Sequence, residues 1–106
     1  MSKLEQKLLF QIRAMGLPEP DREFRAIEGR KFRFDFAWLE QKLLVECQGG
    51  IWTRGAHGRP VGIKRDMEKL NLAQLQGWRV MQFGVDEIDN GEAVGMITKA
   101  LGVEND

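Results

Sequence analysis

Two short stretches of alternating apolar and polar side chains, four residues apart, constrain the fold of this chain most strongly. Residues 31–38 read KFRFDFAW and residues 43–48 read LLVECQ. A period of two is typical of β-strands, and a connection of four residues or fewer suits a hairpin. The sequence therefore predicts two antiparallel strands, with the four aromatic side chains of the first strand on one face.

The hairpin also predicts which residues face each other. A turn at residues 40–41, or at 39–42, pairs positions whose numbers add up to 81, which sets Asp35 opposite Glu46. Like charges directly opposed destabilise a strand pair unless something cancels them. Two carboxylates with carbonyl and water oxygens suit Mg²⁺, or Mn²⁺ as a substitute. The alternative is that both acids lie on a face open to water.

The rest of the chain predicts helices and strands in alternation. Apolar residues at helical spacing end at glycine or proline, and short apolar runs between turn residues indicate strands. We expect a single α/β domain over residues 1–106, ordered α-β-β-β-α-β-α, with a frayed tail after residue 101. The expected elements are helix 2–15, strands 24–27, 31–38 and 43–48, helix 63–76, strand 79–84 and a helix from residue 89 or 90 to 101. We expect Trp38 and Trp78 in the core. Two helices should each have an apolar side: helix 63–76 with Ile63, Met67, Leu70, Ala73 and Leu75, and the last helix with Ala93, Val94, Ile97 and Leu101.

Composition excludes several kinds of site. The chain has one cysteine, Cys47, and one histidine, which excludes an internal disulfide and zinc sites built from Cys and His. Any metal must therefore be held mainly by oxygen ligands. No apolar run approaches the roughly 20 residues that span a bilayer, and the start does not read as a signal peptide. We expect a cytoplasmic protein without a membrane partner.

The zero net charge hides an uneven distribution. The residues from Asp86 onward carry a balance of −5, so residues 1–85 carry +5. A basic segment can neutralise the phosphates of DNA, although a solvated face would look the same. The basic residues of segment 49–69 are Arg54, Arg59, Lys64, Arg65 and Lys69.

Residues 48–62 contain five glycines and a proline, too many for a regular element, which predicts a functional loop. His57 lies there beside basic residues, where it could act as a general acid or base or contact a phosphate. Trp52 could stack on an unpaired base or wedge into DNA. The alternatives are an incidental loop histidine and a tryptophan that covers the end of the core.

The ordered set RFDFAW, LLVECQGG, a helix that begins around RDMEK, and GWRVMQFG resembles the PD-(D/E)XK, or restriction-endonuclease-like, nuclease superfamily. More narrowly, it looks like the branch that includes very-short-patch-repair-type endonucleases and small stand-alone phage and bacterial nucleases. The resemblance covers roughly residues 5–85. It implies a three-layer core with a mixed sheet between helices, and Asp35 and Glu46 as ligands of a catalytic Mg²⁺. It also implies duplex or branched DNA as substrate, a role in phage DNA processing, and a homodimer.

The chain departs from the family pattern at Gln48, where the family most often has a lysine. A glutamine amide can orient a water molecule but cannot supply positive charge. Lys64, Arg65 or Lys69 of the following helix could supply that charge. Loss of catalysis is the other interpretation of Gln48.

Three more residues are predicted to contribute to the site. In the family, an acid on the first helix often reaches the metal through water, and Glu5 fits that position. Ser2 and Glu5 equally fit a capping box at the start of the helix. Cys47 is expected as a small buried residue whose carbonyl, not its sulfur, lies near the metal. Gln74 is expected as a supporting polar group.

The sequence thus predicts a metal-dependent DNA endonuclease. Its candidate catalytic residues are Asp35, Glu46, Gln48, Glu5 and His57. Two alternatives remain open: a nucleic-acid-binding module without catalysis, and a protein-interaction domain on the same fold.

Overall fold

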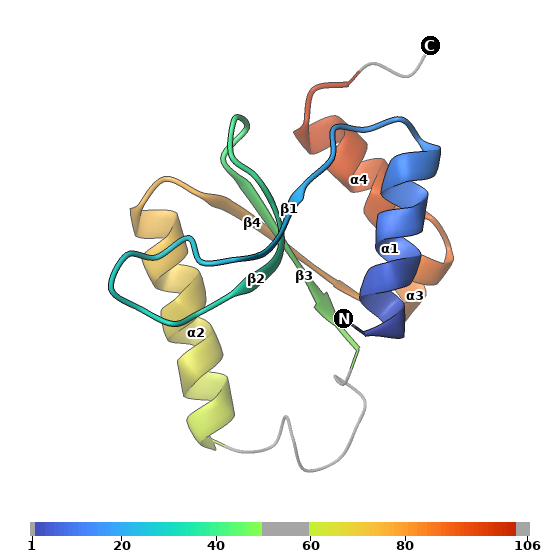
Figure 1. The fold of residues 1–106 in the computed structure, drawn as a ribbon. Helices are drawn as coiled ribbons and strands as arrows, with labels where there is room; N and C mark the ends of the chain where they lie inside the picture. The colour runs from blue at the N-terminus through green and yellow to red at the C-terminus, as the bar shows by residue number, and fades with distance from the viewer. Residues whose placement is uncertain (1, 50–59, 104–106) are drawn as a thin grey trace.

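The computed structural model describes residues 2–49 and 60–103, which form a four-stranded sheet with helices on both faces (Figure 1). The strands lie in the order β1-β2-β3-β4. The pairs β1/β2 and β2/β3 are antiparallel, and β3/β4 is parallel. The elements are α1 (Lys3–Ala14), β1 (Asp21–Phe24), β2 (Phe34–Trp38), β3 (Leu43–Gln48), α2 (Pro60–Leu75), β4 (Arg79–Gly84), α3 (Val85–Asp89) and α4 (Glu92–Ala100).

The helices divide between the two faces of the sheet. Helix α2 lies on one face, and α1, α3 and α4 lie together on the other (Figure 1). Because β3 and β4 are parallel, the chain must cross from the end of one strand to the start of the other, and α2 belongs to that crossover. The predicted α/β class, with a mixed sheet flanked by helices, is confirmed.

Two apolar clusters hold the layers together. The cluster on the side of α1, α3 and α4 includes Leu8, Ile12, Val45 and Ile97, none of which is exposed. The cluster under α2 includes Leu44, Ala73 and Trp78. The expectation that Trp38 and Trp78 belong to the core is confirmed, since both are buried. Within the described ranges, no helix has the length and apolar character needed to cross a membrane.

The hairpin has the predicted register. Phe36 pairs with Val45, Ala37 with Leu44 and Trp38 with Leu43, so each pair adds up to 81. Residues 39–42 form the turn, in which the Lys42 amide donates to the Leu39 carbonyl over 3.1 Å. The paired positions end at Phe36 and Val45, so Asp35 and Glu46 lie directly beyond the last pair of this register.

The faces of β2 differ from the prediction. Phe36 and Trp38 pack in the cluster with α1, but Phe34 packs in the cluster under α2 and Phe32 against it. The four aromatic side chains thus do not share one face, because the alternation changes side at Asp35. The regular period of two in the sequence does not reveal this change, because aromatic side chains pack in the clusters on both sides of the sheet.

Other element boundaries also differ. The first strand lies at 21–24, not 24–27, and the strand predicted from residue 31 begins at Phe34. Helix α2 begins at Pro60, three residues before the predicted start, because proline is favoured in the first turn of a helix. The predicted last helix is preceded by α3, a short helix that the sequence did not predict.

The inner face of α2 was predicted only in part. Ala73 is buried, but Ile63, Met67 and Leu75 are 46%, 54% and 83% exposed. The first turns of α2 extend beyond the sheet (Figure 1), so Ile63 and Met67 have no layer to pack against, whereas Leu75 lies at the other end of the helix. The predicted inward face of α4 is confirmed, because Ala93, Val94, Ile97 and Leu101 are all buried.

Candidate active site

Glu46 of β3 is a buried carboxylate, with 8% of the residue exposed. Its Oε2 atom accepts hydrogen bonds from the side-chain amides of Gln48, over 3.3 Å, and Gln82, over 3.4 Å. Its Oε1 atom accepts one from the ammonium group of Lys69. Burying a charge is costly unless it is paired and hydrogen-bonded, and these three donors meet that requirement.

Lys69 brings a positive charge to Glu46 from α2. Its Nζ atom also donates to the main-chain carbonyl of Arg33 and lies 4.4 Å from the centre of the Phe34 ring. The side chain of Lys69 is only 16% exposed, whereas Lys64 and Arg65 of the same helix are exposed. Lys69 therefore lies at the Glu46 carboxylate and not on the outer surface. It gives the site a positive charge that the uncharged Gln48 cannot supply.

Asp35 lies where β2 changes faces, and its carboxylate is partly buried. Its Oδ2 atom accepts a hydrogen bond from the main-chain amide of Cys47 over 2.8 Å. The pKa of Asp35 is raised from 3.8 to about 6, mainly by burial; the Cys47 amide and Lys69 lower it, and the charges of Glu5 and Glu46 raise it. The site thus holds more negative charge than its own cation cancels.

Glu5 forms the capping box, one of the two interpretations that the sequence left open. The Ser2 hydroxyl accepts from the Glu5 amide over 3.1 Å, and the Glu5 carboxylate accepts from the Ser2 amide, which makes the capping box. The same carboxylate is close enough to raise the pKa values of Asp35 and Cys47. Capping and electrostatic contact with the site therefore occur together.

Cys47 is half-buried and packs against the cluster beside α1. Burial, followed by the charges of Asp35, Glu5 and Glu46, raises the pKa of its thiol to about 12. The thiol is therefore held in its neutral form, in which it is a poor nucleophile. Any contribution to a metal would come from its carbonyl.

The donor set fits a hard cation. Among the described residues, no group of three or more His, Cys, Asp and Glu side chains could hold a metal ion. Mg²⁺ does not need such a cage, because it is bound by one or two carboxylates together with water and substrate phosphates. Asp35 and Glu46, whose charges interact, are the two carboxylates that could serve as that smaller set.

The remaining predicted residues divide into two groups. Gln74 is exposed on α2, and none of the described hydrogen bonds joins it to the carboxylates. Trp52, Arg54, His57 and Arg59 lie outside the described residues.

Sequence reasoning missed Gln82, which lies beside Glu46 because β3 and β4 pair in parallel with Glu46 opposite Gln82. The strand 79–84 was itself predicted. The sequence did not predict which strand it pairs with or in which register. A parallel pairing of strands 43–48 and 79–84 would have predicted that Gln82 lies beside Glu46.

One comparison with solved structures bears on the fold. The structure is similar to the catalytic domain of the homing endonuclease I-Bth0305I, with a TM-score of 0.69, 21% identity and coverage of 94% of each chain. No family model matches the chain. It is 27% identical over 84 residues to two uncharacterized proteins of Mycobacterium tuberculosis, MT2308 (strain CDC 1551 / Oshkosh) and Rv2248 (strain ATCC 25618 / H37Rv). The match spans 79% of this chain but only 30% of each relative.

Proposed function

We propose that this chain is a metal-dependent endonuclease that hydrolyses phosphodiester bonds in DNA. The observation that carries the proposal is the group formed by Asp35, Glu46 and Lys69, two carboxylates and a cation gathered in partly buried positions. The group lies in a fold similar to that of a homing endonuclease catalytic domain. A perturbed carboxylate beside a specific charged partner is typical of functional sites.

The carboxylates of Asp35 and Glu46, with the Cys47 carbonyl, would hold Mg²⁺ or Mn²⁺. When bound, such an ion makes water a better nucleophile at neutral pH and withdraws charge from the phosphoryl oxygens. The hydrogen bond from the Cys47 amide holds the Asp35 carboxylate in place. Below about pH 6, cation binding must displace the Asp35 proton, so metal affinity should fall as the pH drops through this range.

In the family pattern, a single lysine supplies positive charge and positions the attacking water. Here Lys69 would supply the charge and Gln48 would position the water. Lys69 supplies positive charge beside Glu46, where it can stabilise negative charge that develops on a phosphate. The side-chain amide of Gln48 donates a hydrogen bond to the same carboxylate and can orient a water molecule. The substitution at Gln48 is therefore compatible with catalysis, because the missing charge comes from α2.

The test is nicking of supercoiled plasmid with Mg²⁺ or Mn²⁺, with EDTA and Glu46→Ala protein in parallel. Nicking should require both the metal and Glu46. The matched control is Glu40→Ala, which removes an exposed glutamate in the turn at 39–42 and should leave nicking unchanged. Equal nicking by wild-type and Glu46→Ala protein would contradict the assignment of the site and indicate a contaminating nuclease.

Gln48 supports a second candidate, a DNA-binding module without catalysis. This candidate predicts that the protein retards DNA on a gel but cuts neither plasmid nor branched DNA with either metal. It also predicts that Asp35→Ala binds DNA with the affinity of the wild type. A protein that neither cuts nor binds DNA would favour the protein-interaction domain.

A further inference from the structure

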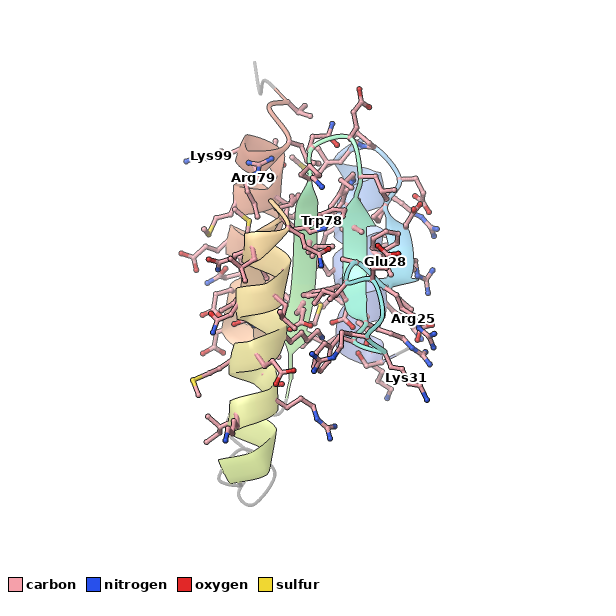
Figure 2. All side chains as sticks on the ribbon, turned by 90° about the vertical axis from the view of Figure 1, so that its left-hand side faces the viewer. Arg25, Glu28, Lys31, Trp78, Arg79 and Lys99 are labelled. Atoms are coloured by element: carbon pink, nitrogen blue, oxygen red, sulfur yellow. The ribbon has the colours of Figure 1, made fainter. Side chains whose placement is uncertain are left out.

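The connection between β1 and β2 carries more positive charge than the described residues neutralise. Residues 25–33 contain Arg25, Arg30, Lys31 and Arg33 against one acid, Glu28. Arg30 pairs with Glu68 of α2, and Arg33 lies 3.4 Å from Glu23. Arg25 and Lys31 form no ion pair with a described carboxylate. Figure 2, which looks onto α2, shows both on this connection.

This connection and α2 form a basic hollow. A depression of about 490 Å³ is lined by Gly29, Arg30, Lys31, Phe32 and Arg65. A second one of about 230 Å³ shares Arg30, Phe32 and Arg65 with it. The second is completed by Lys64 and Glu68.

The walls of the basic hollow are fixed by contacts. The guanidinium of Arg30 lies 4.8 Å from the centre of the Phe32 ring and pairs with Glu68, so it joins the connection to α2. Lys31, Lys64 and Arg65 are exposed and have no described carboxylate as an ion-pair partner. The hollow thus combines an ordered frame with three free cations, which is the arrangement that attracts phosphate groups.

The basic hollow also lies close to the carboxylates. Arg65 precedes Lys69 by four residues, about 6 Å along α2 at 1.5 Å per residue, and Lys69 contacts Glu46. Lys69 further bonds to the carbonyl of Arg33, which ends the basic connection. A DNA strand at the carboxylates would therefore reach the hollow within one or two nucleotides.

We propose that the basic hollow binds the phosphate backbone of duplex DNA next to the bond that is cut, with Lys31 and Arg65 as its phosphate contacts. This inference rests on the proposed function, and it assigns a binding role to the β1–β2 connection. Contacts to phosphates position the substrate without reading its sequence. The hollow should therefore raise affinity equally for different sequences.

The test compares Lys31→Ala/Arg65→Ala with wild-type protein and with Arg13→Ala/Lys99→Ala. Both double variants remove one exposed arginine and one exposed lysine, so their net charges are equal. Arg13 and Lys99 lie near the C-terminal ends of α1 and α4, at the opposite end of the molecule from the end of β3 (Figure 1). Circular dichroism and thermal melting establish that both variants fold.

Binding of a short fluorescent duplex is followed by anisotropy, with Ca²⁺ in place of Mg²⁺, as salt is raised from about 50 to about 200 mM. Each lost phosphate contact should lower the slope of log affinity against log salt by about 0.9, so wild type should lose about tenfold more affinity over this range than Lys31→Ala/Arg65→Ala. The control variant should match wild type. In nicking assays, Lys31→Ala/Arg65→Ala should raise KM and leave kcat unchanged.

The outcomes separate this inference from the proposed function. If wild type nicks plasmid and both double variants bind with the wild-type slope, the hollow is not a phosphate site and the nuclease assignment stands. If Lys31→Ala/Arg65→Ala alone loses slope but wild type never nicks, the hollow stands and the nuclease assignment fails. If wild type neither binds nor nicks, both are wrong.

Discussion

Asp35→Asn should make the metal-free protein more stable while it removes the response to metal. The pKa of Asp35 is raised from 3.8 to about 6, so the folded protein holds this proton more tightly than the unfolded chain. Ionised Asp35 therefore destabilises the folded state. An asparagine keeps an oxygen that accepts from the Cys47 amide, but it carries no charge to bury.

The size of the effect follows from the pKa. A difference of about two pH units corresponds to about 3 kcal/mol at 1.36 kcal/mol per unit. Because Asp35 is partly exposed to solvent, which screens its charge, we expect a gain of about 1–2 kcal/mol in the free energy of unfolding at neutral pH. In a domain of this size, that gain raises Tm by about 5–10 °C.

Urea unfolding in EDTA between pH 4 and pH 8 measures this prediction. The stability that protonated Asp35 gives to wild type is present below pH 3.8 and is lost as the pH rises through about 6. The advantage of Asp35→Asn should thus be full near pH 8 and vanish toward pH 4. Asp21→Asn, at an exposed position of β1, should show no such change. An Asp35→Asn protein no more stable than wild type near pH 8, or an advantage independent of pH, would refute the reasoning.

Three further changes test the electrostatics of the site and the packing of the core. Lys69→Met leaves the Glu46 carboxylate buried without its cation and should cost about 3 kcal/mol in urea unfolding, most of which Glu46→Gln should restore in the double variant. An unchanged midpoint for Lys69→Met would contradict the ion pair. Glu5→Gln can keep the capping box, so stability should change by less than about 0.5 kcal/mol, while the pKa of Asp35 falls in a carbon-detected NMR titration. Phe36→Ala should cost about 3–5 kcal/mol by calorimetry, because the ring is fully buried, and a smaller loss would place it outside the core.

The fold could be predicted where a local pattern determines it. The period of two and the short turn fix the register of the hairpin, and helical spacing fixes the inward face of α4. β1 was misplaced because its four residues, DREF, are largely exposed and show no apolar alternation. The change of faces between Phe34 and Phe36 depends on which layer each ring meets, which no local pattern records.

The candidate site was likewise predictable only where its residues belong to neighbouring segments of the chain. Asp35 and Glu46 could be brought together from the sequence because they belong to one hairpin. Gln82 and the placement of Lys69 required knowledge of how β4 pairs with β3 and how α2 lies on the sheet. Local propensity indicates helices and strands, but the contacts between distant segments depend on packing.

The edge of the sheet formed by β1 has a consequence for how copies of this chain can associate. An edge strand presents unpaired main-chain groups that can recruit a strand from another molecule. β1 is only four residues long, three of them charged and exposed, and Glu23 has a left-handed φ of 49°. These features make β1 a poor template for intermolecular strand addition. Any contact between copies of this chain should therefore use surfaces other than this edge, and concentrated protein should resist aggregation along it.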